Sequence, residues 1–207
     1  MKKLNIAIIL DKSGSMQSIR EATVKAFNQQ VETLHKEKKE NVETNVSLCT
    51  FSSYVDEPLL FNVSLDKLKK LKLEHYIPSG STALNDAIAL NVLKLSNIQE
   101  ENDENLIIVI TDGQENQSYF LSDHKSKNGI KTFIKLYSST EKWKFVFLAA
   151  NNTKKYLRSK YGVSDVQIFD ATEEGVNIAS DHLSRSMTGY IASYSKGEKQ
   201  ESFWGEK

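Results

Sequence analysis

The sequence contains little cysteine, little proline and no excess charge, and these shortages exclude several classes of protein. Its single cysteine, Cys49, leaves no partner for an intramolecular disulfide, which suits a reducing cytoplasm. Lys plus Arg and Asp plus Glu both number 27, so no overall field favours nucleic acid or a membrane surface. No apolar run approaches the ~20 residues of a transmembrane helix. We therefore expect a cytoplasmic protein that binds neither nucleic acid nor membrane.

Apolar runs and helical patterns alternate along the 207 residues, which are enough for one well-packed domain. Residues 4–10, 106–110 and 145–150 are almost continuously apolar, as is typical of parallel strands covered on both faces. The segments between such runs carry apolar residues at helical spacing. This alternation predicts an α/β fold in which a mostly parallel central sheet is doubly wound by helices on both faces.

Two strand-like segments, residues 44–51 and 54–63, follow each other directly and predict a hairpin. Pro58 in the second segment cannot donate a ladder hydrogen bond, so this strand belongs at an edge of the sheet. Ser18 and Glu21 have the spacing of a capping box, which predicts the start of a helix at Ser18.

A loop of small oxygen-bearing side chains follows the first apolar run. Asp11, Ser13 and Ser15 stand at alternate positions just past the predicted strand, so their oxygens can gather at one point. Such donors suit Mg²⁺ or Mn²⁺, which accept hydroxyls, carboxylates and waters together, whereas softer ions favour His or Cys. The loop therefore predicts a site for a hard cation.

Two later segments suit the same point. Thr82 follows a Ser-Gly-Ser turn, and Asp112 lies in a Thr-Asp-Gly sequence directly after the run 106–110. Because the carboxyl ends of parallel strands meet at one edge of the sheet, Asp112 should reach the edge that holds Asp11. Each piece alone fits a turn or a helix cap equally well, but the three pieces together favour a metal site.

The combination of Asp-x-Ser-x-Ser, a later Thr and a strand-terminal Thr-Asp-Gly resembles the von Willebrand factor A (VWA) domain with its metal-ion-dependent adhesion site. The resemblance places Asp11, Ser13, Ser15, Thr82 and Asp112 at the five ligand positions of that site. It implies a Rossmann-like sheet with one antiparallel edge strand. It also implies a binding module, not an enzyme, whose Mg²⁺ or Mn²⁺ accepts an Asp or Glu side chain from a partner protein.

The resemblance covers residues 1–195 as one VWA-like domain and leaves a C-terminal tail at residues 196–207. We expect Phe203 and Trp204 in this tail to dock on the domain or to be disordered, with partner anchoring as the alternative. A start without a signal sequence, without disulfides and without attached domains resembles stand-alone members from bacteria and their phages. Some of those members work with AAA+ ATPases, which makes such an ATPase a candidate partner by analogy.

A Mg²⁺- or Mn²⁺-dependent hydrolase that uses the same site is the second hypothesis. It needs a general base near the ion, and Glu115 is the acidic candidate just after Asp112. A haloacid-dehalogenase site would need a second Asp where Ser13 stands, and the sequence has no phosphate loop or nucleophile elbow. Of the four histidines, His75 and His124 lie on the connections closest to the predicted site.

The loop after Asp112 carries a run of polar residues and one aromatic residue. They are Gln114, Glu115, Asn116, Gln117 and Tyr119. Because loops on a rigid scaffold often carry binding residues, this loop is expected to rim the metal site and to contribute to the choice of partner. An ordinary polar loop is an equal alternative.

Overall fold

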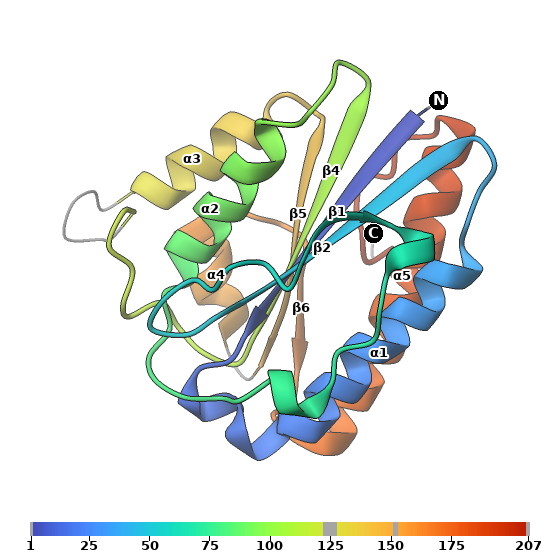
Figure 1. The fold of residues 1–207 in the computed structure, drawn as a ribbon. Helices are drawn as coiled ribbons and strands as arrows, with labels where there is room; N and C mark the ends of the chain where they lie inside the picture. Colours follow the sequence, from blue (N-terminus) through green and yellow to red (C-terminus); the bar gives the residue numbers. More distant parts are fainter. Residues whose placement is uncertain (1, 122–127, 151–152, 206–207) are drawn as a thin grey trace.

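The computed structural model describes residues 2–121, 128–150 and 153–205. Its strands form one sheet in the order β3-β2-β1-β4-β5-β6 (Figure 1). They are β1 (Lys2–Asp11), β2 (Val42–Phe51), β3 (Leu60–Ser64), β4 (Asp103–Thr111), β5 (Trp143–Ala150) and β6 (Val166–Phe169). Only β2 and β3 pair in antiparallel orientation, which confirms the mostly parallel sheet with one antiparallel edge strand.

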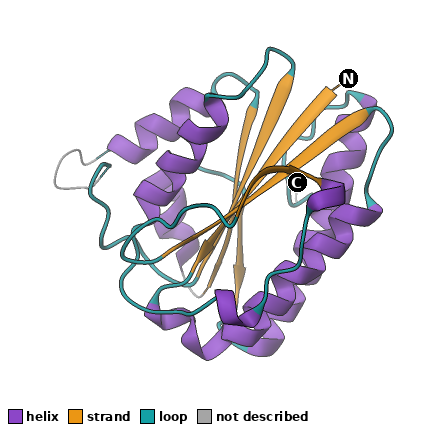
Figure 2. Ribbon diagram, in the orientation of Figure 1, coloured by secondary structure: helices purple, strands orange, loops and turns teal. Residues whose placement is uncertain are grey.

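Helices cover both faces of the sheet (Figures 1 and 2). The α-helices are α1 (Arg20–Lys36), α2 (Leu84–Ser96), α3 (Gly129–Ser138), α4 (Lys154–Tyr161) and α5 (Glu173–Lys196). The short 3₁₀-helices are η1 (Gly14–Ile19), η2 (Leu65–Lys67) and η3 (Leu73–His75). Helices α1 and α5 pack together on one face, while α2, α3 and α4 lie on the other, as expected for a doubly wound fold.

Strand β1 lies at the centre of the sheet between β2 and β4. Ile6 and Ile8 belong to the core cluster shared with α1 and α5, whereas Ala7 and Ile9 belong to the cluster shared with α2 and α3. Because successive side chains of a strand point to opposite faces, a strand covered on both sides must be apolar throughout. This explains the continuous apolar run at the start of the chain.

The connections around β1 define the place where a ligand site can form. The chain leaves β1 through α1 to reach β2, and it later returns through α2 to reach β4 on the other side of β1. Since α1, which follows β1, and α3, which follows β4, cover opposite faces, the loops after the two strands separate there. In open α/β sheets this switch point, beyond the carboxyl ends of the strands, is where ligands bind.

Two local expectations differ from the structure. Helix α1 begins at Arg20 after the turn of η1, and the Ser18 hydroxyl contacts the Ser15 carbonyl oxygen at 3.5 Å without capping a helix. The predicted capping box was wrong because the loop continues as a 3₁₀ turn beyond Ser18. Strand β3 starts at Leu60, after Pro58, and is therefore shorter than the predicted extended segment.

The C-terminal tail docks on the domain. Helix α5 ends before Gly197, which adopts a left-handed conformation with φ 78°. Phe203 is fully buried in the core cluster of α1 and α5, and Trp204 is also buried. The Phe203 backbone N–H donates to Asp165 Oδ1 at 2.8 Å, at the start of β6. Residues up to 205 thus follow the docking expectation.

Candidate functional site

Asp11 is the last residue of β1 and is fully buried. Its Oδ1 accepts from the Ser13 backbone N–H at 2.7 Å, and its Oδ2 accepts from the Thr111 hydroxyl at 2.6 Å. The Tyr76 hydroxyl donates to the Asp11 carbonyl oxygen. Because β1 and β4 are parallel and in register, Thr111 at the end of β4 reaches Asp11 directly. The carboxylate is therefore held in one orientation from two strands.

Ser13 and Ser15 connect the loop after β1 with the loop after β4. Their hydroxyl oxygens lie 3.2 Å apart. The Ser15 hydroxyl donates to Asp112 Oδ1 at 2.7 Å. Ser13 is buried, whereas Ser15 is exposed and Asp112 is partly exposed, so the site opens to solvent on the Ser15 side.

Backbone contacts bring the segment that carries Thr82 against the loop after β1. The Gly14 N–H donates to the Gly80 carbonyl oxygen at 3.0 Å, and the Ser79 N–H donates to the Lys12 carbonyl oxygen at 2.8 Å. Gly80 has φ +76°, and a Cβ there would lie 2.5 Å from Ser53 Oγ. The close approach of these loops therefore requires glycine at this position.

Gly113 shows how closely the three loops converge. A Cβ built on Gly113 would lie 3.5 Å from Thr82 Oγ1 and 4.0 Å from both Asp11 Oδ2 and Ser15 Oγ. Oxygens from three segments therefore surround one small space that glycine leaves open. The structure brings Asp11, Ser13, Ser15, Thr82 and Asp112 together, as the sequence predicted, and their role as ligands stays a prediction.

The carboxylates of the site are held in an environment that disfavours their charge. Burial raises the pKa of Asp11 to about 6; the charge of Asp112 adds to this, and hydrogen bonds from Thr111 and Ser13 partly offset it. Burial also raises the pKa of Asp112. Lys12, the nearest lysine in the chain, pairs instead with Asp56 at 2.8 Å. Within the described residues, neither Asp11 nor Asp112 forms an ion pair.

The donor set suits a hard cation. Over the part of the chain that the structure describes, no three His, Cys, Asp or Glu side chains gather as a metal-binding group. The site consists instead of hydroxyls with two carboxylates around the small space that Gly113 leaves open, and Mg²⁺ and Mn²⁺ prefer oxygen donors in a compact arrangement. The residues present therefore fit such an ion.

The supporting contacts of three residues were not identified from the sequence. Thr111 fixes the Asp11 carboxylate, Tyr76 holds the Asp11 carbonyl, and Asn116 Oδ1 accepts from the Thr82 backbone N–H at 2.8 Å. Thr111 belongs to the Thr-Asp-Gly sequence, so the motif itself could have indicated it. Tyr76 and Asn116 act across long sequence separations, and no local pattern indicates their contacts.

Glu115, the proposed general base, has a structural role. Its Oε2 accepts from the Asn85 N–H and the Ser118 hydroxyl, both at 2.7 Å. Its Oε1 accepts from the Gln117 N–H at 2.8 Å and the Ser118 N–H at 2.6 Å. These contacts occupy both oxygens and tie the loop to the first turn of α2, so no oxygen is left to activate a water.

The histidines give no base for the site within the described residues. His75 is exposed, and its nearest charged contact is Glu74 at 3.7 Å. His124 lies outside the described residues.

The fold and the site define a class: an α/β protein whose doubly wound sheet carries hydroxyls and carboxylates at the switch point between its central strands. The sequence profile of the von Willebrand factor type A domain matches residues 5–160. The chain belongs to this family.

Solved structures of this fold come from several organisms. The PilB minor pilin of Streptococcus sanguinis aligns with TM-score 0.63 and 13% identity over 92% of this chain and 62% of the pilin. BatB of Bacteroides thetaiotaomicron aligns with TM-score 0.60 and 16% identity over 90% of this chain and 98% of BatB. The manganese-loaded TRAP protein of Plasmodium vivax aligns with TM-score 0.59 and 18% identity over 86% of this chain and 72% of TRAP.

The chain spans less than two thirds of the pilin, and at these identities the likeness concerns the fold alone. No curated protein sequence is significantly similar to this chain. None of the helices in the described ranges is long and apolar enough to cross a membrane.

Proposed function

We propose that the chain is a metal-dependent protein-binding module. Ser13, Ser15 and Thr82 would hold Mg²⁺ or Mn²⁺ through their hydroxyls, while Asp11 and Asp112 supply negative charge and orient those hydroxyls. When bound, an ion held mainly by neutral oxygens stays electrophilic and accepts a carboxylate from a partner protein. The site would thus be an intact metal-ion-dependent adhesion site.

The observation that supports this proposal is the uncompensated charge of the site. Asp11 and Asp112 are drawn together with three hydroxyls, and within the described residues no lysine, arginine or histidine pairs with either carboxylate. Burying charge without a partner costs free energy, as the raised pKa of Asp11 shows. A divalent cation from solution would remove that cost and make the arrangement favourable.

Membership of the VWA family supports a protein-interaction module, and the TRAP structure of this fold is manganese-loaded. A cytoplasmic location, the likeness to stand-alone bacterial or phage members and an AAA+ ATPase partner stay predictions. The absence of enzymatic activity also stays a prediction, although the saturated carboxylate of Glu115 removes the general base that the hydrolase hypothesis required.

Calorimetric titration with Mg²⁺ and with Mn²⁺ tests the proposal. We expect saturable binding to the wild type and none to Asp112→Ala. Ser18→Ala is the matched control for Ser15→Ala, because both remove a hydroxyl from η1 but Ser18 contacts only a backbone oxygen. Thr82→Val removes one hydroxyl at nearly constant volume, so it keeps the test valid if Asp112→Ala does not fold.

A partner-like probe extends the titration. An Asp-containing peptide should bind more tightly when the cation is present, and by linkage the cation should then bind more tightly with the peptide. Equal cation binding by the wild type, Asp112→Ala and Thr82→Val, or no binding by the folded wild type, would overturn the proposal.

A further inference from the structure

The loop after Asp112 exposes two neighbouring aromatic side chains. Tyr119 is 68% exposed and Phe120 is 63% exposed, and their rings contact edge to face with centroids 5.7 Å apart. Each ring can bury ~150–250 Å² of surface in a contact, so two adjacent exposed rings offer a large area for binding. We call this pair the aromatic platform.

The backbone beneath the platform is fixed by a buried carboxylate. Asp86 accepts from the Tyr119 N–H at 2.6 Å and the Phe120 N–H at 2.9 Å, and more weakly from the Leu121 N–H at 3.3 Å. Glu115 holds the preceding residues of the same loop in the same manner. Hydrogen bonds to ionised acceptors are among the strong ones, so the loop presents its two rings from a prearranged backbone.

The platform stands beside the candidate cation site. The loop residue Asn116 contacts Thr82, and Tyr119 follows Asn116 by three residues, which span at most about 11 Å. The Asn116 N–H donates to the Thr82 carbonyl oxygen at 3.1 Å, so the loop passes the site before it reaches the platform. The Tyr119 backbone therefore lies within about 11 Å of Asn116, the residue that contacts the candidate ligand Thr82.

Other large apolar side chains exposed in the described residues include isolated ones on helices, such as Leu136 on α3 and Ile178 on α5. Scattered exposure of this kind is normal on a soluble protein, whereas adjacent rings on a fixed loop beside a polar site have the composition of an interface centre. A preorganised aromatic contact also loses little conformational entropy on binding.

We propose that the aromatic platform binds a large apolar side chain that the partner carries close to the acidic residue at the cation site. This inference rests on the proposed function. A peptide in extended conformation advances about 3.3 Å per residue, so the apolar side chain would lie two or three positions from the Asp or Glu. A basic side chain could also stack on the rings, but the nearby divalent cation would repel it.

Selection from a phage-displayed library tests this inference. The library would present dodecapeptides with Asp fixed at the centre and all other positions random, selected in Mg²⁺ and counter-selected in EDTA. The targets would be the wild type, the platform variant Tyr119→Ser/Phe120→Ser and the control variant Leu136→Ser/Ile178→Ser. The control removes two large side chains with similar exposure, 65% and 63%, from helices α3 and α5 outside the loop.

From the wild type and the control we expect Mg²⁺-dependent peptides enriched in Leu, Ile, Met, Phe or Trp two or three positions from Asp. The platform variant should lose that enrichment and should bind a selected peptide at least tenfold more weakly. Its cation affinity, measured by calorimetry without peptide, should equal that of the wild type, because neither ring belongs to the site.

The outcomes separate the two proposals. Mg²⁺-dependent peptides without apolar enrichment, enrichment in Lys or Arg, or unchanged enrichment with the platform variant would overturn the platform alone. Peptides that bind equally in EDTA, or equally to Thr82→Val, would overturn the proposed function and this inference with it. A complete lack of Mg²⁺-dependent peptides would do the same.

Discussion

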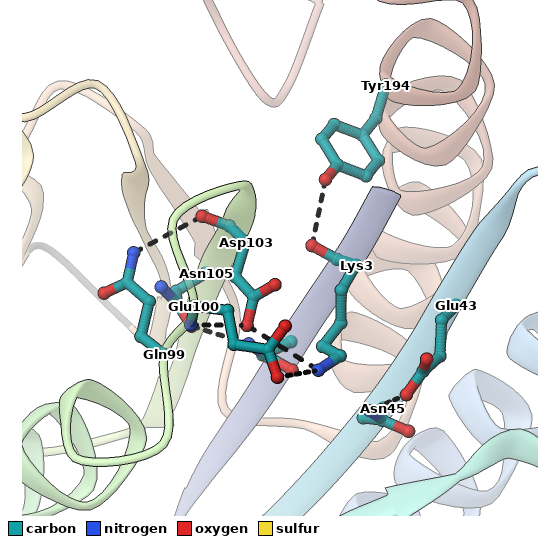
Figure 3. A network of polar contacts seen from close by, with 9 residues as sticks. Lys3, Glu43, Asn45, Gln99, Glu100, Asp103, Asn105 and Tyr194 are labelled. Carbon is teal, nitrogen blue, oxygen red and sulfur yellow. Dashed lines mark hydrogen bonds and ion pairs between the residues drawn. The ribbon is translucent and has the colours of Figure 1, made fainter. Parts of the chain in front are cut away.

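The two ends of the sheet treat their carboxylates in opposite ways. At the amino ends of β1 and β4, Lys3 Nζ lies 3.5 Å from Glu100 Oε1 and 3.9 Å from Asp103 Oδ2 (Figure 3). Asp103 Oδ2 also accepts from the Glu100 backbone N–H at 3.0 Å. At the carboxyl ends of the same strands, Asp11 and Asp112 meet only hydroxyls and backbone N–H groups among the described residues.

This difference separates carboxylates that have an ion-pair partner from those of the proposed cation site within one sheet. The chain supplies its own cation at the amino end, so Glu100 and Asp103 are paired without any ligand. At the carboxyl end it brings two carboxylates to the same point and supplies hydroxyls in place of a lysine, which leaves charge to be neutralised from outside. The contacts of the C-terminal tail also lie at the amino end of the sheet, because the tail docks at the amino ends of β5 and β6.

Removing the buried ring of Phe203 from the C-terminal tail should give the largest effect, and this effect should be confined to stability. Phe203→Ala would leave a cavity in the core of α1 and α5 and lower the free energy of unfolding by about 3–5 kcal/mol. Urea unfolding measures this loss, and calorimetry on the folded fraction should give an unchanged cation affinity. A tenfold change in affinity would show that the two ends are coupled.

Filling the space at Gly113 should act on binding alone. In Gly113→Ala the new methyl meets its neighbours at ordinary contact distances and the backbone has no positive φ, so the fold should tolerate it. The methyl would crowd the oxygens that surround the site, and we expect cation affinity to fall about 100-fold. Gly189→Ala, where no atom lies within 4 Å, is the matched control. Unchanged affinity in Gly113→Ala would place the cation elsewhere.

The raised pKa of Asp11 predicts a pH dependence with a definite sign. In the metal-free protein the folded state holds this proton more tightly than the unfolded state, so stability contributed by Asp11 is lost as pH rises from about 4 through about 6. Cation binding needs the ionised carboxylate, so affinity should fall about tenfold per unit below pH 6. Melting temperatures with and without Mg²⁺ measure both trends.

Asp11→Asn is the control for this pH dependence, because it removes the titrating group while keeping its shape. If the variant shows the same change in metal-free stability between pH 4 and 6 as the wild type, then Asp11 is not the group responsible.

Removing the cation at the amino end should have the smallest effect. Lys3→Met keeps most of the apolar stem and removes the pair with the exposed Glu100 and the long pair with Asp103, whose Oδ2 keeps its hydrogen bond from the Glu100 N–H. Exposed or long pairs of this kind contribute about 1 kcal/mol or less. We expect a small drop in melting temperature and no change in Mg²⁺ affinity. Because salt screens the ion pair of the wild type, added salt should reduce the difference in melting temperature between the two proteins. A loss of affinity would mean that the amino end contributes to the site.

The sequence predicts the parts of this molecule that depend on local pattern. The apolar run at residues 4–10 predicts a central strand, because a strand covered on both faces is apolar throughout. The residues of the Asp-x-Ser-x-Ser and Thr-Asp-Gly motifs are small and polar, so they are expected where the apolar runs of the strands end. The start of α1 was misplaced because capping signals resemble the 3₁₀ turn that precedes it.

What the sequence does not reveal are contacts made by distant side chains. The Thr111 hydroxyl reaches Asp11 over 100 residues, and the Tyr76 hydroxyl reaches it over 65. The structural role of Glu115 was missed for the same reason, since its partner Asn85 on α2 lies 30 residues earlier and becomes a neighbour only in the folded chain.

The wide spacing of the three site segments has a consequence for biosynthesis. Residues 11–15 leave the ribosome before the other two segments, the oxygens of Thr82 and Asp112 follow some 70 and 100 residues later, and β4 must pair with β1 before all three segments meet. A nascent chain that stops before β4 therefore has the Asp-x-Ser-x-Ser loop but no complete site. Because ligands stabilise only the state that binds them, Mg²⁺ would act on the newly synthesised protein only after the centre of the sheet has assembled.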